Sequence, residues 1–162
     1  MARGKGAATQ GDRLVSLNRR ASFEYFIEDK FEAGLVLIGS EARSLRENHA
    51  DLSDAWIDVD RRGEAWVKML RIPHLKHAAF GHLPDRPRKL LLHREQIERV
   101  RGLRERDGMT LIATKCYFKN NRAKLEVAVA RGKKQHDKRN SIKEREADRE
   151  ARVAMRRGRR GP

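Results

Sequence analysis

Residues 110–130, TLIATKCYFKNNRAKLEVAVA, decide the fold of this chain. Two runs rich in apolar, β-branched and aromatic side chains flank the polar stretch KNNR at 119–122, and this pattern predicts a β-hairpin. The second run alternates apolar and polar side chains, as a strand packed on a core does. The next stretch, GKKQHDKR at 132–139, has no apolar side chain at all. The sequence therefore predicts a packed domain that ends near residue 131 and a cationic tail that follows it.

Other stretches add strands to this hairpin. EYFIEDKFEAGLVLIG (24–39) predicts a long strand that is bent or bulged at Gly34. DAWIDVD (54–60) and AWVKMLRI (65–72) both alternate and are separated by a short turn at 61–63, so they predict a further hairpin. Together these stretches predict five or six strands, with neighbouring strands antiparallel.

Two helices are expected beside the strands. SEARSLREN (40–48) can be capped by Ser40. LLLHREQIERVRGLRERDG (90–108) has apolar side chains at three-residue spacing and a closing Gly108. A mainly β chain with short flanking helices is indicated, and an OB-like closed antiparallel barrel fits the strand count best. A mixed α+β sandwich stays open at this point.

The charge is distributed as unevenly as the apolar residues. The 162 residues carry a formal net charge of +15, of which residues 23–130 contribute +3 and residues 131–162 contribute +8. Residues 1–16, rich in glycine, alanine and polar side chains, predict a disordered N-terminal arm. We therefore expect an arm (1–16), an OB-like RNA-binding barrel (17–131) and a basic C-terminal tail (132–162). Such basic ends favour a polyanionic partner, because Lys and Arg release counterions when they neutralise phosphates.

The tail predicts a helix that has no apolar face to bury. Ser141 and Glu144 have capping-box spacing, and nothing breaks a helix from 142 to 157. Since larger apolar side chains are scarce there, we expect the tail to be disordered when free and helical when bound. His136 can stack on a base, and no Leu/Phe/Trp stripe suits a lipid surface, so RNA is favoured over a membrane. A tail that serves only solubility stays open.

The single cysteine indicates a reducing cellular compartment. Cys116 cannot form an internal disulfide and lies in a predicted strand, where we expect it to be buried. No apolar run is long enough for a transmembrane helix, and the first residues lack the apolar centre of a secretion signal. We therefore expect a cytoplasmic protein without a membrane partner.

Two rival readings concern metals. Asp58, Asp60 and Glu64 could hold Mg²⁺ for a nuclease, although the polar outer face of a hairpin explains them more simply. The histidines at 74, 77 and 82 lack the second ligand pair of a zinc site. We expect no enzyme activity, metal or cofactor. A generic OB-fold binder of single strands or ribosomal RNA is the alternative, although aromatic residues for stacking make up only 6% of the chain.

Four longer blocks carry a resemblance. They are LNRRASFEYFIEDKFEAGLVLIGSEARSLRENHADLSDAW (17–56), DRPRKLLLHREQI (85–97), YFKNNRAKLEVAVARGKKQHDKR (117–139) and IKERE (142–146). In this order they closely resemble the small protein B (SmpB) family, the SsrA-binding proteins of bacteria. The resemblance implies an OB-like, monomeric adaptor that binds the tRNA-like domain of transfer-messenger RNA (tmRNA, or SsrA RNA). It also implies delivery of alanyl-tmRNA, with elongation factor Tu and GTP, to the A site of stalled 70S ribosomes for trans-translation, that is, ribosome rescue and peptide tagging.

The resemblance also implies roles for single residues. The family's tmRNA-contacting positions fall on Glu32, Leu91, His93 and Lys124. In the tail, which the resemblance places in the decoding centre and the empty mRNA channel, the implied positions are Gly132, Lys133, Lys134, His136, Asp137, Lys138 and Arg139. Gly132 matches the family's hinge and His136 its stacking residue. Ala147 stands where many members have tryptophan, so the resemblance does not fix the register of the distal tail.

Overall fold

A computed structural model describes residues 12–47, 49–76 and 81–158 of the chain. The strands are β1 (Arg13–Leu17), β2 (Tyr25–Leu35), β3 (Trp56–Val59), β4 (Ala65–Lys68), β5 (Arg88–Leu91), β6 (Thr110–Lys119) and β7 (Arg122–Gly132). The helices are α1 (Ala21–Glu24), α2 (Gly39–Glu47), α3 (Arg94–Asp107) and α4 (Gln135–Gly158). The predicted arm at 1–11 and His77 lie outside the described residues.

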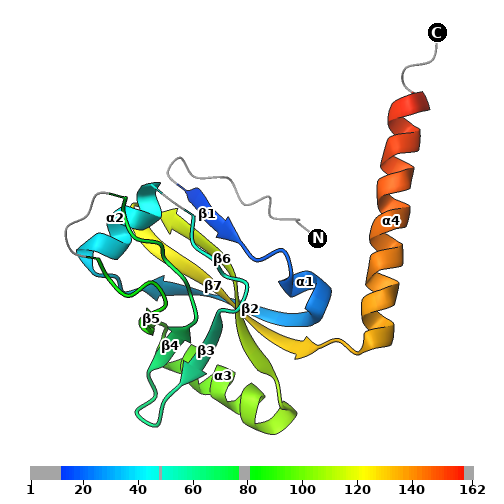
Figure 1. The fold of residues 1–162 in the computed structure, drawn as a ribbon. Coiled ribbons are helices and arrows are strands. Elements are labelled where there is room, and N and C mark those ends of the chain that lie inside the picture. The colour runs from blue at the N-terminus through cyan, green and yellow to red at the C-terminus, as the bar shows by residue number, and fades with distance from the viewer. Residues whose placement is uncertain (1–11, 48, 77–80, 159–162) are drawn as a thin grey trace.

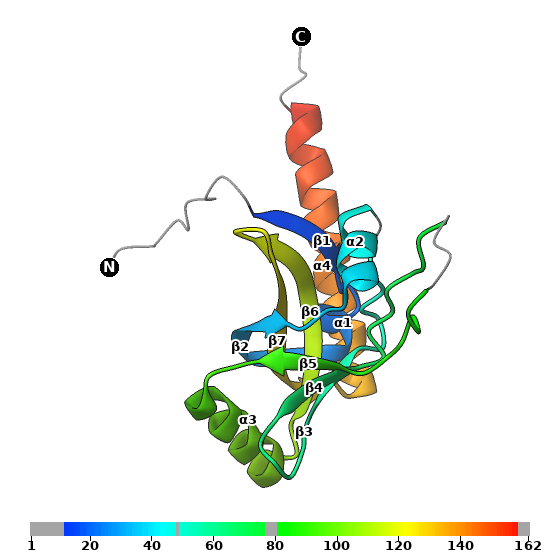
Figure 2. The same cartoon turned by 90° about the vertical axis from the view of Figure 1, so that its left-hand side faces the viewer.

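The strands form one antiparallel sheet that closes on itself. Its order is β1-β6-β3-β4-β5-β2-β7, and β7 pairs back onto β6. The joint between β3 and β6 rests on one register pair, Trp56 with Ile112, so the ring is nearly rather than fully continuous there. Figures 1 and 2 show this ring with α3 below it and α2 beside it. The prediction of a mainly antiparallel β fold with flanking helices is confirmed.

The central hairpin forms where the sequence predicts it. Asn120 and Asn121, between β6 and β7, have φ angles of 48° and 65°, as a tight type I′ hairpin turn requires. Cys116 of β6 is buried, and burial raises the pKa of its thiol to about 12. This thiol is a core side chain and stays protonated at neutral pH.

The N-terminal boundary of the barrel differs from the prediction. Residues 13–16, which composition assigned to a disordered arm, belong to β1, which pairs with residues 115–118 of β6. The apolar side chain of Val15 explains the difference, because it is 4% exposed and packs into the core. A single apolar side chain in a polar stretch does not give the alternating pattern from which a strand can be predicted.

Three local boundaries also differ. β2 does shift its register, but between Ile27 and Asp29 rather than at Gly34. Residues 90 and 91 belong to β5 instead of the predicted helix, because Leu90 is buried between β4 and β2; α3 begins after His93, its N-cap. Ser40 lies inside α2 and contacts Nδ1 of His82 rather than capping the helix.

The C-terminal tail is helical over a longer range than the sequence predicts. The predicted helix began at 142, whereas α4 begins at Gln135. No proline or glycine separates residue 135 from Ser141, and the side chain of Asp137 accepts a hydrogen bond from the backbone N–H of Lys134 at 3.4 Å, which is an N-terminal cap contact. Figures 1 and 2 show α4 extending away from the ring on the side opposite α2.

Candidate nucleic-acid interface

A groove of about 590 Å³ lies between α2, the β6–β7 turn and the junction of β5 with α3. Its lining residues include three cationic side chains, one carboxylate, two amides, several apolar side chains and the rings of His93 and Phe118. They are Glu32, Gly34, Leu35, Leu37, Ala42, Arg46, Leu91, Leu92, His93, Gln96, Phe118, Asn121, Arg122, Ala123 and Lys124. Cationic groups suit phosphates, and exposed apolar or planar groups suit unstacked bases. The groove therefore has the chemistry of a nucleic-acid surface.

The four residues that the resemblance implies for tmRNA all line this groove. They come from three strands and a helix N-terminus that are distant in sequence. Gly34 of β2 brings the strands together, since it pairs with Leu91 of β5 on one side and with Lys124 of β7 on the other. A Cβ atom at Gly34 would lie 3.2 Å from Cβ of Leu91, so the close approach of β2 and β5 favours glycine.

Glu32 is the groove's carboxylate, and it is held in place by neighbours. The hydroxyl of Tyr117 donates a hydrogen bond to Oε2 at 2.5 Å, and Nζ of Lys119 lies 3.3 Å from the same oxygen. Nζ of Lys124 lies 4.0 Å from Oε1. The hydrogen bond from Tyr117 lowers the pKa of Glu32, and the two lysines lower it further against a smaller opposing effect of burial. Glu32 is therefore an ionised, oriented acceptor.

Leu91 and His93 form the opposite wall. The side chain of Leu91 is 58% exposed, which is unusual for a leucine in a strand whose other apolar side chains are buried. His93 caps α3: its backbone N–H donates to Oε1 of the Gln96 side chain at 3.1 Å, and its own side chain accepts a hydrogen bond from the backbone of Gln96 in return. His93 is thus held at the groove edge with an exposed ring.

Sequence reasoning missed the wall contributed by α2 and the β6–β7 turn. Arg46 lies with its guanidinium carbon 4.8 Å from the centre of the Phe118 ring and donates from Nη1 to Oδ1 of Asn121 at 2.7 Å. Arg122 follows in the same turn and lines the groove. The sequence predicted only a helix end around Arg46 and a turn around Asn121 and Arg122. The packing of α2 against this turn is what brings the three side chains into one wall.

The tail residues lie on the other side of the ring, at the base of α4 (Figure 1). Gly132 ends β7 opposite Tyr25. Nζ of Lys133 donates to the carbonyl of Ser22 at 3.0 Å and to Oγ of Ser141 at 2.8 Å, and it lies 4.8 Å from the centre of the Phe26 ring. The tail thus begins with a lysine that is fixed against α1 and β2.

The remaining tail positions project from the first turns of α4. Lys134, His136 and Arg139 are exposed, whereas Asp137 and Lys138 are half-buried. Nδ1 of His136 lies 3.3 Å from Oδ1 of Asp137, and the imidazole side chain is 83% exposed. The structure does not bring these residues to the groove, so groove and tail are two separate surfaces.

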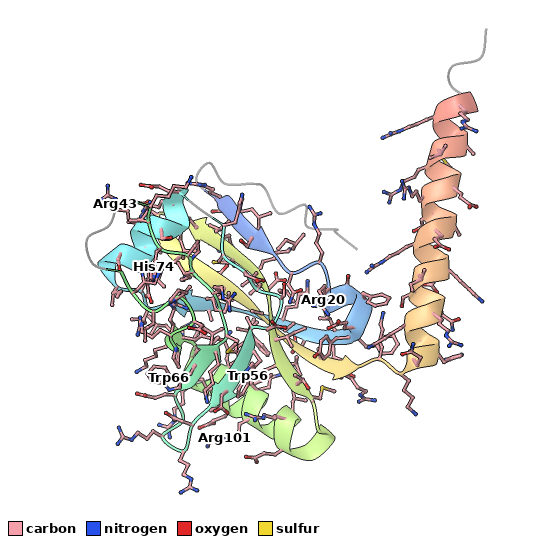
Figure 3. The ribbon with its side chains drawn as sticks, viewed as in Figure 1. Arg20, Arg43, Trp56, Trp66, His74 and Arg101 are labelled. Carbon is pink, nitrogen blue, oxygen red and sulfur yellow. The ribbon has the colours of Figure 1, made fainter. Side chains whose placement is uncertain are left out.

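The carboxylates considered for Mg²⁺ are already paired. Asp58 receives Nζ of Lys68 at 2.9 Å and Nη1 of Arg104 at 2.8 Å, and Glu64 receives Nζ of Lys89 at 2.8 Å. Figure 3 shows Trp56 and Trp66 on the β3–β4 hairpin and Arg101 on the neighbouring α3. The carboxylate of Asp60 instead accepts hydrogen bonds from the backbone N–H groups of Arg62 and Glu64 and from Nε1 of Trp66.

Two of the histidines considered for zinc, His74 and His82, contact backbone carbonyls. His74 contacts the carbonyl of His82 through Nε2, and His82 contacts the carbonyl of Ile72 through Nε2 at 2.9 Å. Across the described residues, which leave out His77, no group of three or more His, Cys, Asp or Glu side chains could hold a metal ion. Among the same residues no helix has the length and apolar character needed to cross a membrane.

A nearly closed antiparallel ring, a groove with cationic side chains and a separate basic helix define a small, mostly β protein of the nucleic-acid-binding class. The profile of the SmpB protein family matches residues 15–157, and the chain belongs to this non-enzymatic family. That membership decides against the nuclease reading.

Known relatives agree with this assignment over nearly the whole chain. The SsrA-binding protein of Sorangium cellulosum is 50% identical over 157 residues, which cover 97% of this chain and 96% of the relative. The SsrA-binding protein of Anaeromyxobacter dehalogenans is 49% identical, with 97% and 96% covered. A solved structure described as "tmRNA-SmpB: a journey to the center of the bacterial ribosome" has a TM-score of 0.64 at 34% identity and covers 79% of this chain and 94% of that one.

Proposed function

We propose that this protein is the adaptor of bacterial trans-translation, which binds the tRNA-like domain of tmRNA and delivers alanyl-tmRNA to the A site of stalled 70S ribosomes. The names of the relatives as SsrA-binding proteins and the description of the related structure support tmRNA and the ribosome as partners. Elongation factor Tu with GTP accompanies the aminoacylated RNA. The protein acts as a cytoplasmic monomer and performs no chemistry of its own.

The observation that carries this proposal is the convergence of Glu32, Leu91, His93 and Lys124 on one groove. Glu32, the Leu91–His93 pair and Lys124 lie far apart in sequence, and no local pattern required them to meet. Lys124 neutralises a phosphate, Leu91 covers the face of an unstacked base, and Glu32 accepts hydrogen bonds from a base edge. Tyr117 keeps Glu32 oriented for this role through the bond to Oε2, while Nζ of Lys124 lies 4.0 Å from Oε1.

The tail serves a second contact, in the decoding centre and the empty mRNA channel. Gly132 is the hinge, Lys133, Lys134, Lys138 and Arg139 provide charge for ribosomal RNA, and Asp137 belongs to the same contact set. The exposed ring of His136 stacks on a base. Beyond the first turns, which touch α1, the tail becomes stably ordered only inside the ribosome, because α4 has few apolar side chains to bury. Groove and tail lie on separate surfaces, which lets one protein hold tmRNA and probe the ribosome together.

A competition experiment tests the proposal. The full chain is titrated against a labelled tRNA-like domain at physiological salt, with and without excess poly(U). We expect tight binding that poly(U) does not reduce, since the groove recognises a folded RNA shape. Lys124→Ala should weaken binding about tenfold and lower the slope of log affinity against log salt by about one unit, whereas Lys143→Ala on the exposed tail should change neither.

Three results would contradict the proposal or part of it. Displacement by poly(U) would show a generic single-strand binder, and equal effects of the two lysine variants would remove Lys124 from the interface. Cleavage of the RNA in Mg²⁺ would show an enzyme.

A further inference from the structure

Arg46 has an arrangement that its position at the end of α2 does not require. The guanidinium lies over the Phe118 ring, 4.8 Å from its centre, and reaches the β6–β7 turn through the 2.7 Å hydrogen bond from Nη1 to Oδ1 of Asn121. Phe118 is 5% exposed and belongs to the core, so the support beneath Arg46 is rigid. Arg46 itself is exposed and lines the groove.

We propose that Arg46 is a stacking platform for an unpaired base of the bound RNA. This inference rests on the proposed function and names what the groove reads: a base that has left its stack. A guanidinium plane stacks on bases much as an aromatic ring does. Phe118 supports the guanidinium from one side, and Arg46 also lines the groove. Exposed Leu91 stands in the same groove as the apolar partner surface.

The hydrogen bond to Asn121 favours stacking over a phosphate contact. Arginine binds phosphates best through the paired N–H groups at its edge. In this protein Nη1 is directed at the side chain of Asn121 and Nη2 lies 3.4 Å from its carbonyl oxygen. With the Nη1–Nη2 edge committed to the turn, Arg46 keeps its exposed face and its Nε–H for RNA. Arg122 and Lys124, which line the groove beside it, supply charge for phosphates.

The test uses variants that separate charge from planarity. Arg46→Lys keeps the charge and removes the plane, whereas Arg46→Ala removes both. Arg43→Lys is the matched control, because Arg43 lies on the same helix at the edge of the molecule (Figure 3) and its side chain is 74% exposed. Each full-length variant is titrated with the tRNA-like domain, and with a series of the same RNA in which single unpaired loop nucleotides are made abasic.

We expect Arg46→Lys to weaken binding of the intact RNA about tenfold, the usual effect of losing one stacked base. The salt dependence should stay unchanged, since the charge is kept. One abasic position should weaken binding by the wild-type protein about tenfold and have no effect on Arg46→Lys, because the lost base and the lost plane belong to one contact. Arg43→Lys should behave as wild type throughout.

The outcomes separate this inference from the proposed function. If the wild-type protein binds the tRNA-like domain despite poly(U) but Arg46→Lys binds equally well, the platform is refuted and the function stands. The same conclusion follows if every abasic RNA loses as much affinity with Arg46→Lys as with wild type, because Arg46 then only braces the turn. If the wild-type protein does not prefer the tRNA-like domain, the proposed function itself fails.

Discussion

Glu41 has none of its surface exposed, and its carboxylate is shared between two arginines. Nε of Arg88, which is also fully buried, donates to Oε1 at 2.8 Å, and Nη2 of Arg86 donates to Oε2 at 2.9 Å. The backbone N–H of Ile38 adds a bond to Oε2 at 3.1 Å. These contacts join α2, β5 and the loop before β5, and so they set the position of the groove wall that carries Arg46.

Glu41→Gln should lower the free energy of unfolding by about 3–5 kcal/mol, because it leaves the buried Arg88 guanidinium without its counter-charge. Urea titration followed by circular dichroism measures the change. Glu47→Gln is the control, since Glu47 lies in the same helix with a side chain 57% exposed and should change stability by less than about 0.5 kcal/mol. Equal effects of the two variants would mean that the buried pair is not a main determinant of stability.

The pKa of Glu41 predicts how the free energy of unfolding changes at acid pH. Burial raises the pKa of Glu41, but the bonds from Arg86, the Ile38 N–H and Arg88 outweigh it, and the pKa ends below the usual 4.5. A lowered folded-state pKa gives stability that is fully present above the unfolded value and is lost as pH falls through the folded value. The loss below pH 4.5 should therefore be shallower in Glu41→Gln than in wild type.

Single residues also show where sequence reasoning reaches its limit. Asn120, Asn121 and Gly108 could be placed in advance, because a positive φ at a turn or helix end is a local requirement of the chain. Arg46 over Phe118 could not, because the contact depends on how α2 packs across the ring. The roles of Glu32 and Lys124 were suggested only by the family resemblance, because no local pattern in the sequence distinguishes either residue.

At the scale of elements, α4 divides into two parts. Its first turns contact α1: Nη2 of Arg145 donates to Oγ of Ser22 at 2.8 Å, and its guanidinium carbon lies 5.7 Å from the centre of the Phe23 ring. Lys133 adds the contacts already described. Beyond Arg145 the described residues of α4 are exposed. The alternation of β7 was readable in the sequence, but this docking was not, since it joins residues more than a hundred positions apart.

Amide hydrogen exchange on the free protein should follow this division. We expect measurable protection of the amides from 138 to 145, where α1 holds the helix, and exchange close to that of an unfolded peptide from 146 to 157, because an isolated helix of that length is marginal. Arg145→Ala should remove the proximal protection, whereas Lys143→Ala, an exposed neighbour, should leave it intact. Firm protection of 146–157 in the free protein would refute the proposal that the distal tail orders only in the ribosome.

For the whole molecule, the charge pattern and the architecture agree. The near-neutral middle of the chain forms the ring, and the strongly basic end forms α4 outside it. The sequence was sufficient to predict this division because apolar side chains stop abruptly after β7. The sequence predicted a closed barrel but not how the ring forms, since β3 meets β6 through one register pair and β1 adds to β6 from residues that look like a polar arm.

The separation of ring and tail predicts that truncation of the tail separates tmRNA binding from peptide tagging. A chain ended after Gly132 keeps the whole of β7, including its pairs with Tyr25 and Phe26, and it keeps the groove. We expect this variant to unfold at nearly the same urea concentration as the full chain, because α4 contributes few buried apolar side chains. It should bind the tRNA-like domain with nearly unchanged affinity, yet give no tagged peptide in a reconstituted translation assay with stalled ribosomes.

Adding the separate tail peptide in trans should not restore tagging, since the tail acts at the high effective concentration that its covalent link provides. Tagging by the shortened chain would show that the groove alone performs both steps, and lost tmRNA affinity would show that the tail belongs to the tmRNA site.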